Sequence, residues 1–220
     1  MPSHNYFTSS IGKKQITALT GLGLLGFTAA HLAGNLLVLL GADTFNAYSH
    51  ELVSHPLILF AQVGLAALFL AHIFTAIFVT VQNAQARSKR YYIKTRSGRG
   101  ETIASMTMPI TGVILLVFII LHLLNFKFGT EYQTTVDGVV MRDIFRTVVE
   151  YFANPFYVAW YVFAMLALGL HTGHGLQSSA QTWGLNHPKY TPVIKFASVA
   201  YGATVAVGFS AISIYCHFLN

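Results

Sequence analysis

The chain contains the stretch Gly26-Phe-Thr-Ala-Ala-His31-Leu-Ala-Gly-Asn35, inside a run from Ile16 to Leu40 that carries no charged side chain. A helix needs about 20 mostly apolar residues to cross the hydrocarbon core of a bilayer, so this run is long enough to span it. Polar side chains such as His31 and Asn35 are costly inside lipid and usually mark a functional site. The stretch therefore predicts a membrane-spanning helix that contributes to a buried polar site.

Four more apolar runs follow, and together they predict an all-α integral membrane protein with five transmembrane helices. The composition agrees, because 54% of the residues are hydrophobic and only 9% are charged, whereas soluble domains have about 25% charged residues. We expect a single membrane domain over residues 1–220, with helices over residues 14–41, 56–86, 102–126, 155–183 and 192–218. Residues 42–55 are expected to be a short connection. The segment Val140–Phe152 has helical periodicity and is expected to form a helix at the membrane surface.

The formal net charge of +6 does not indicate a nucleic-acid partner, because the basic residues cluster in loops rather than on one face of a folded domain. With five alternating helices, ten of the thirteen Lys and Arg residues fall on the side of the N-terminus, six of them in residues 87–99. Cytoplasmic loops carry the excess of Lys and Arg in membrane proteins. We therefore expect a multi-pass protein of the inner (cytoplasmic) membrane, with its N-terminus in the cytoplasm and its C-terminus outside. The basic loop 87–99 would also attract anionic lipid.

Four of the ten histidines lie inside predicted helices, one on each of the first four: His31, His72, His122 and His171. A helical rise of about 1.5 Å per residue places His31 roughly 25 Å and His122 roughly 30 Å from the side of the N-terminus. By the same rise, His72 lies at about 22 Å and His171 at about 15–22 Å. The sequence thus predicts two levels in the membrane: an outer one with His31 and His122, and an inner one with His72 and His171.

Two histidine pairs on four helices are what two haems with two imidazole ligands each require, and cofactor sites of this kind are built in the cores of helical bundles. We therefore expect a haem-binding bundle with two haem b groups. His31 and His122 would hold the outer iron, and His72 and His171 the inner iron. His174, one turn from His171, is an alternative ligand, although contact with a haem propionate or a partner is the preferred interpretation.

These histidines have two other interpretations. A single intramembrane histidine also serves as a hydrogen-bonding group between helices or in a proton relay, so a haem-free transporter with a histidine relay is one alternative. A zinc site is disfavoured, because the chain has no HExxH motif, its only cysteine is Cys216, and the predicted spans lack carboxylates.

The chain resembles the five-helix, di-haem cytochrome b subunits of succinate dehydrogenases and fumarate reductases, of the type with a single membrane anchor. The resemblance covers nearly the whole chain and rests on five segments. They are His31-Leu-Ala-Gly-Asn35-Leu, Asn46-Ala-Tyr48, Ala71-His72-Ile, Leu121-His122-Leu and His171-x-x-His174-Gly-x-x-Ser178-x-x-Gln181-Thr-x-Gly184. In that family the histidines of the first and third membrane-spanning helices hold the outer haem, and they correspond to His31 and His122 here. The histidines of the second and fourth hold the inner haem, and they correspond to His72 and His171. This is the pairing that the depths predict.

The resemblance implies a function in electron transfer. Such a subunit anchors a flavoprotein subunit and an iron–sulfur subunit on the cytoplasmic face, and it carries electrons between the iron–sulfur clusters and a quinone, typically menaquinone. It would be the quinone-reactive subunit of a multisubunit oxidoreductase, with the succinate or fumarate chemistry on the flavoprotein. In related enzymes an acidic residue near the outer haem takes part in quinone protonation, and Glu51 is the candidate here. The nearest alternative is a di-haem anchor of a nitrate reductase, formate dehydrogenase or hydrogenase.

Overall fold

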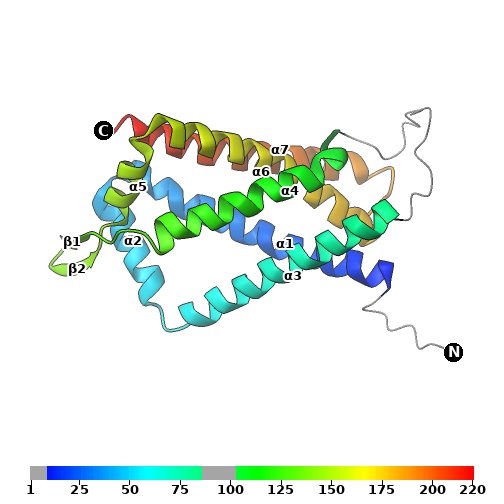
Figure 1. Ribbon diagram of the computed structural model, residues 1–220, viewed down its shortest axis with the longest axis horizontal. Coiled ribbons are helices and arrows are strands. Elements are labelled where there is room, and N and C mark those ends of the chain that lie inside the picture. Colours follow the sequence, from blue (N-terminus) through cyan, green and yellow to red (C-terminus); the bar gives the residue numbers. More distant parts are fainter. Residues whose placement is uncertain (1–8, 86–102) are drawn as a thin grey trace.

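Five long helices run along the molecule and are joined at one end by shorter elements (Figure 1). The computed structural model describes residues 9–85 and 103–220, so the basic loop 87–99 lies outside the described residues. All five helices are long and apolar enough to cross a membrane, which confirms the expected all-α membrane fold. They are α1 Ser10–Asn35, α3 Ile58–Gln85, α4 Ile103–His122, α6 Pro155–Thr182 and α7 Thr191–His217.

Local sequence determines where several of these helices begin and end. The side chain of Asn154 accepts a hydrogen bond of 2.9 Å from the amide of Phe156 at the start of α6, and such caps satisfy amides that are free in a first turn. α1 continues into the 3-10 turn η2 Leu36–Leu40, which ends at Gly41. The φ of +101° at Gly41 is a backbone conformation that favours glycine.

The order in which the helices pack determines which side chains can meet. α3 packs against α1, α1 and α4 each pack against α6, and α7 packs along α6. The approach of α6 to α7 is close, because a Cβ atom on Gly169 would lie 2.7 Å from the carbonyl oxygen of Gly202, and small residues permit such contacts in membrane bundles. The helices α3, α1, α6 and α4 thus follow one another in that order. In this order α1 and α4 are second neighbours, and so are α3 and α6.

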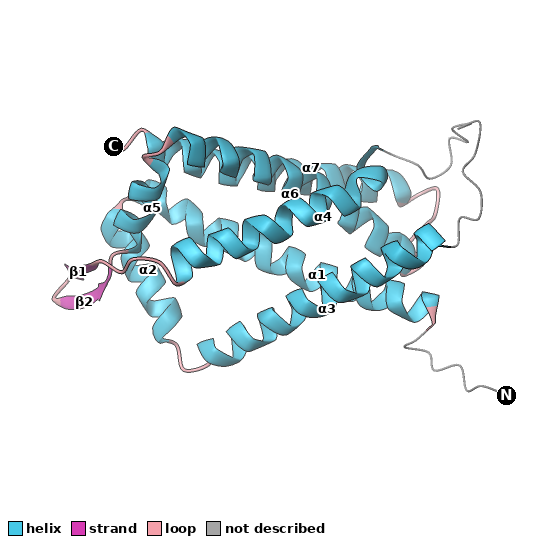
Figure 2. Ribbon diagram, in the orientation of Figure 1, coloured by secondary structure: helices cyan, strands magenta, loops and turns pink. Residues whose placement is uncertain are grey.

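One end of the bundle, here called the hairpin end, carries three further elements (Figure 2). They are α2 Ala42–Ser54, an antiparallel hairpin of β1 Gln133–Val136 with β2 Val139–Arg142, and α5 Ile144–Phe152. Two expectations are therefore corrected: residues 42–55 are mostly helical, and residues 140–142 form a strand rather than the start of a surface helix. The strand forms because of the turn at Asp137 and Gly138, whose φ angles of +50° and +79° are those of a two-residue hairpin.

α5 is also more than a surface helix, because one of its faces is part of the apolar core. Val148 and Phe152 of α5 are buried there, in a cluster that joins α1, α2, α5, α6 and α7. The other buried members of the cluster are Leu32, Val38, Phe45, Tyr161, Ile212 and Cys216. This cluster fixes the hairpin end relative to the long helices.

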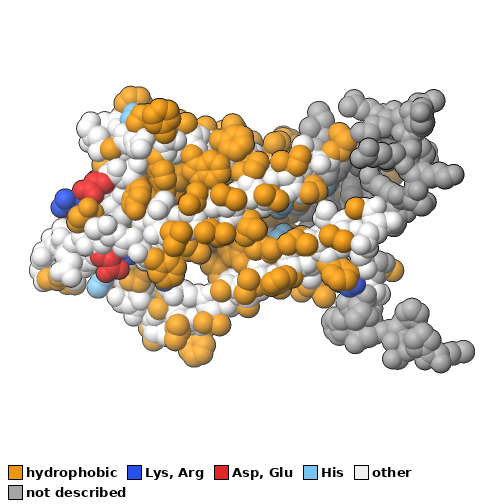
Figure 3. Space-filling model, in the orientation of Figure 1, with side chains coloured by type: hydrophobic (Ala, Val, Ile, Leu, Met, Phe, Trp, Pro, Cys, Tyr) orange, Lys and Arg blue, Asp and Glu red, His pale blue; other side chains and the backbone are white. Residues whose placement is uncertain are grey.

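The surface of the long helices is largely apolar along the middle of the molecule (Figure 3). Among the described residues, every Asp and Glu lies at the hairpin end, in α2, in α5 or in the segment 128–143 that contains the hairpin. The described part of the opposite end carries four lysines, in the first turns of α1 and α7 and in the connection before α7: Lys13, Lys14, Lys189 and Lys195. An uncharged belt between two polar ends is what a membrane-spanning bundle requires.

Candidate functional site

Two pairs of histidines face each other across the bundle. The ring centroids of His31 on α1 and His122 on α4 are 6.0 Å apart, with the ring planes at 90°. The ring centroids of His72 on α3 and His171 on α6 are 6.4 Å apart, at 75°. The first pair, here called the outer pair, lies nearer the hairpin end, and the second is called the inner pair. The structure thus brings together the residues that the predicted depths group.

The separation within each pair suits one metal ion between two imidazoles. Metal–imidazole bonds are about 2 Å long, and adding the distance from nitrogen to ring centre on both sides puts the centroids roughly 6 Å apart. Among the described residues, no three His, Cys, Asp or Glu side chains are placed to hold a metal ion together. Each pair would therefore supply two ligands only, which is the donor set of a haem iron with two axial histidines.

The hydrogen bonds of the inner pair determine which ring nitrogen is free. Nδ1 of His72 lies 3.2 Å from the carbonyl oxygen of Thr17 and 3.2 Å from the hydroxyl of Thr20. The Thr20 hydroxyl donates its hydrogen to the carbonyl of Ile16 at 2.8 Å, so its oxygen accepts from the histidine. Nδ1 of His72 therefore carries the proton, and Nε2 keeps its lone pair for a metal ion.

His171 has an equivalent arrangement on the other side of the inner pair. Its Nδ1 lies 3.1 Å from the hydroxyl of Thr111, which donates its own hydrogen to the carbonyl of Thr107 at 3.1 Å. Metal-binding histidines in general donate their second N–H to an acceptor, which fixes the tautomer and the ring orientation. Both rings of the inner pair meet this condition.

Aromatic rings surround the outer pair. Phe27 stacks on His31 with centroids 5.3 Å apart and an interplanar angle of 16°, and Phe118 stacks on His122 at 5.6 Å and 27°. Each phenylalanine precedes its histidine by one helical turn. Nδ1 of His122 lies 3.1 Å from the hydroxyl of Tyr161. The outer pair is therefore held in a more aromatic setting than the inner pair, with the Asn35 amide 3.3 Å from Nδ1 of His31 as a further polar neighbour.

The remaining predicted site residues lie apart from the two pairs. His174 is half-buried on α6, and among the described residues it makes no ring contact with a second histidine, so His171 is the residue that faces α3. Glu51 is exposed on α2 at the hairpin end, the same end as the outer pair. Tyr48 of α2 lies against α1, since a Cβ on Gly34 would be 2.7 Å from its hydroxyl oxygen.

Three partners of the histidines were not predicted from the sequence: Thr20, Thr111 and Tyr161. A partial signal exists for the threonines, because each is a hydroxyl residue in an uncharged run of a predicted helix. Their contacts with His72 and His171 depend on how α1 packs against α3 and α4 against α6, which spacing along one helix does not encode.

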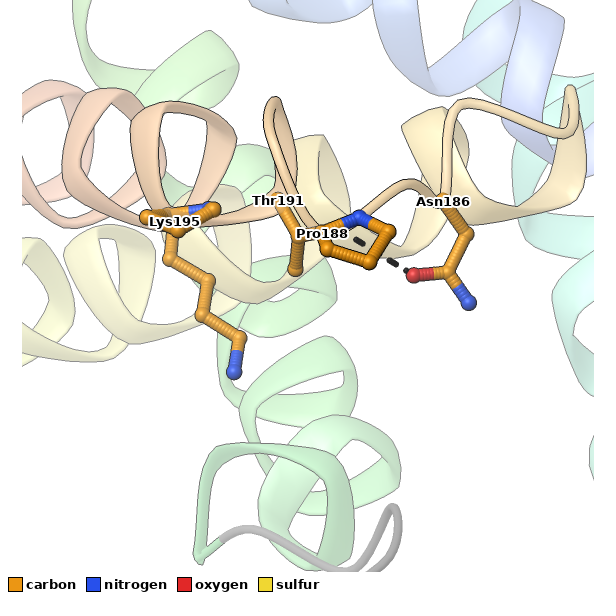
Figure 4. Close-up of a pocket in the computed structure, with 5 residues that line it drawn as sticks. Asn186, Pro188, Thr191 and Lys195 are labelled. Carbon is orange, nitrogen blue, oxygen red and sulfur yellow. Dashed lines mark hydrogen bonds between the residues drawn. The ribbon is translucent and has the colours of Figure 1, made fainter.

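A surface pocket of about 620 Å³ lies at the connection between α6 and α7, and its lining residues are distinct from those of both pairs. Asn186, Pro188, Thr191, Pro192 and Lys195 line it. The Thr191 hydroxyl donates to the Asn186 side-chain oxygen at 3.2 Å across it (Figure 4). This pocket is open and carries none of the predicted site residues.

The fold and the site together define a membrane-spanning helical bundle with two histidine pairs, each suited to one metal centre. The sequence profile of the succinate dehydrogenase/fumarate reductase transmembrane subunit family matches residues 82–210. The chain belongs to this family, and it is thus a membrane subunit of an oxidoreductase complex. This membership favours the succinate/fumarate class over the anchors of other respiratory complexes.

A curated relative supports the same assignment. The chain is 24% identical over 203 residues to the succinate dehydrogenase cytochrome b558 subunit of Bacillus subtilis (strain 168), and the match covers 88% of this chain and 94% of that protein. No solved structure matches the chain.

Proposed function

We propose that this chain is the di-haem, quinone-reactive subunit of a succinate:quinone oxidoreductase, either a succinate dehydrogenase or a quinol:fumarate reductase. The observation that carries the proposal is the presence of two facing histidine pairs with ring separations of 6.0 Å and 6.4 Å. In a family of cytochrome b subunits, such pairs fit two haem b groups. His31 and His122 would hold the outer iron, and His72 and His171 the inner iron.

When bound, each haem supplies one-electron transfer. The protein holds and orients the ligands: the hydroxyl groups near Nδ1 of His72, His122 and His171 and the Thr17 carbonyl near Nδ1 of His72 fix these imidazole rings, and the aromatic rings around the outer pair exclude water. Because the two pairs lie at two levels along the bundle, they define a route for electrons from one membrane face toward the other.

Quinone chemistry needs protons as well as electrons, so we place the quinone near the polar boundary at the hairpin end. Tyr48, His50 and Glu51 lie there on α2, and Glu51 is the proposed proton-transfer group. Electrons that reach this end from the opposite face cross the membrane potential, and one charge through 100 mV is worth about 2.3 kcal/mol. Glu51→Gln should keep both haems and lower the turnover with menaquinone or a related quinone. Unchanged turnover would remove Glu51 from the proposal.

The proposal includes partners and orientation. A flavoprotein subunit and an iron–sulfur subunit would bind at the end opposite the hairpin end, with the N-terminus in the cytoplasm, the C-terminus outside and the bundle in the inner membrane. The excess of Lys and Arg on that side of the chain supports this orientation. His174, three residues from His171 toward that end, is proposed to contact a haem propionate or a partner subunit.

The test is haem counting and redox titration of the purified complex, made with haem available. His31→Ala and His72→Ala should each remove one b-type haem and spare the other. His187→Ala serves as the control, because His187 lies in the α6–α7 connection, where its ring accepts a hydrogen bond from the Lys189 amide and contacts the ring of Tyr190.

Two results would contradict the proposal. Absence of a b-type α band in the wild-type complex would contradict haem binding by both histidine pairs. Retention of both haems in both histidine variants would show that the ligands are other residues, and His174→Ala would then test the alternative for the inner iron.

A further inference from the structure

His122 is the start of a longer chain of polar contacts at the hairpin end. Its Nδ1 lies 3.1 Å from the hydroxyl of Tyr161, whose side chain is only 7% exposed. Tyr157, one turn earlier on α6, lies beside Tyr161, with ring centroids 5.0 Å apart. The side-chain amide of Asn125 also donates to the Tyr157 hydroxyl. The contacts therefore run from α4 to α6 and back to the end of α4.

The ligand role of His122 determines the donor in its bond with Tyr161. A histidine that binds metal through Nε2 carries its proton on Nδ1, so His122 donates to the oxygen of Tyr161. The hydroxyl hydrogen of Tyr161 is then free to be donated to another acceptor, and the neighbouring side chain is Tyr157. A hydroxyl that donates becomes a better acceptor, because hydrogen bonds in a chain polarise one another.

The surroundings of the chain hold it in place. Tyr161 packs edge-on against Phe118 at 4.9 Å and Phe152 at 4.8 Å between ring centroids. Asn125 lies in the π-helical turn η3 Leu123–Lys127 that follows α4, and π-helical turns in helices frequently occur at functional sites. No function stated above accounts for Tyr157 or Asn125.

The two pairs differ in this respect. The hydroxyl partners of the inner pair, Thr20 and Thr111, pass their hydrogen to a backbone carbonyl of their own helix. The hydroxyl of Tyr161 instead belongs to a ring that packs against Tyr157, with centroids 5.0 Å apart, and Asn125 after α4 donates to the Tyr157 hydroxyl. The surroundings of the bond at His122 therefore depend on side chains from two helices. Changing one of these side chains can therefore alter the outer pair without altering the inner one.

We propose that Tyr161 is a positioning residue for His122 and that Tyr157 and Asn125 hold Tyr161 in place. Together these three side chains set the electronic properties of the outer metal centre separately from those of the inner one. The inference rests on the proposed ligation by His122. An acceptor at Nδ1 makes the imidazole a stronger ligand for the oxidised metal, so losing the acceptor should raise the midpoint potential of the outer centre.

The experiment is a redox titration of the whole complex carrying Tyr161→Phe in a His72→Ala background, in which the outer haem alone remains. The midpoint potential of the outer haem should rise by up to about 59 mV, which corresponds to a tenfold change in the one-electron equilibrium constant. The low-spin electron paramagnetic resonance signal should change as well. Tyr157→Phe should shift the midpoint in the same direction by less. Tyr201→Phe is the matched control, because that hydroxyl donates at 2.6 Å to the carbonyl of Leu25 and not to a histidine.

A wild-type midpoint and signal in Tyr161→Phe, with the outer haem present, would overturn the inference and leave the proposed function intact. A complex without haem in the wild-type protein would overturn both. If Tyr161→Phe fails to accumulate, Tyr157→Phe is the test. An unshifted midpoint potential of the outer haem in that variant would also contradict the inference.

Discussion

The ring of His72 on α3 lies directly against Gly21 on α1. A Cβ atom built on Gly21 would be 3.2 Å from Cε1 of His72, which is closer than an ordinary van der Waals contact. The carbonyl oxygen of Thr17 and the hydroxyl oxygen of Thr20, both on α1, accept a hydrogen bond from Nδ1 of this ring. α1 therefore contacts both the edge and the polar nitrogen of a residue on another helix, and it orients one ligand of the inner pair while supplying His31 to the outer pair.

Replacing Gly21 should disturb the inner pair in proportion to the size of the new side chain. We expect Gly21→Ala to displace the His72 ring by a few tenths of an ångström and to weaken haem retention, and Gly21→Val to remove the inner haem from most of the population. Changing a residue that orients a metal ligand typically costs about 10–100-fold in affinity for the metal centre. The measurement is haem content per complex, with the two haems distinguished by their midpoints.

Gly23→Ala is the matched control on the same helix. A Cβ there would lie 3.3 Å from Cδ2 of Leu68, so the crowding is similar but the neighbour is a flexible apolar side chain. Equal haem loss in the two variants would mean that Gly21 acts through helix packing in general and not through His72.

The placement of the histidines could be predicted from the sequence because a helix has a regular rise. A count of residues from the charged helix ends ranks the depths of His31 and His72, and the same count works for their partners on other helices. The hydrogen bonds to those histidines could not be predicted in this way. Tyr161 meets His122 only because of the rotation of α6 relative to α4, and that rotation is a property of packing.

The hairpin shows a different limit. The segment Val140–Phe152 has apolar residues at helical spacing, but its first three residues pair with β1 instead. The local signal for this outcome is Asp137-Gly138, a dipeptide typical of two-residue hairpin turns. Short apolar segments fit either period, so the turn and the pairing strand decide the structure. Residues 42–55 differ from the expected connection because α2 buries Phe45 and Asn46 against neighbouring elements, and packing of one face stabilises a short helix.

The contact between α6 and α7 leaves no room for a side chain at Gly169. A Cβ there would lie 2.7 Å from the Gly202 carbonyl oxygen and 2.8 Å from Cβ of Ala206. Overpacking of this kind costs about 1–3 kcal/mol, so Gly169→Ala should lower the melting temperature of the detergent-solubilised complex. A Cβ atom on Gly64 of α3 would have no neighbour within 4 Å, so Gly64→Ala should leave the melting temperature unchanged. Similar melting temperatures for Gly169→Ala and the wild type would contradict the close approach of the two helices.

Asn46 connects α2 to the start of α5. It is 1% exposed, donates to the Asp143 carboxylate at 2.9 Å and accepts from the Phe145 amide at 2.9 Å. Removing one partner of a buried hydrogen bond costs about 1–3 kcal/mol, so Asn46→Ala should destabilise the hairpin end. A double-mutant cycle with Asp143→Ala, followed by thermal unfolding, should give a coupling energy clearly different from zero. Strict additivity would show that the two side chains do not stabilise each other.

The charged face of α5 should give a pH dependence of known sign. Hydrogen bonds from Tyr132 and then from Arg146 hold the pKa of Glu150 below its usual value, with Arg146 Nε 2.9 Å from the carboxylate. A carboxylate whose pKa is lower in the folded state stabilises the fold above its unfolded pKa, about 4.3. That contribution is lost as the pH falls through the folded value. Glu150→Gln should therefore melt slightly below the wild type at pH 7, and the difference should shrink when both are acidified below about pH 4. Tyr132→Phe should show the same trend with a smaller amplitude, and a difference that stays constant with pH would rule out this origin.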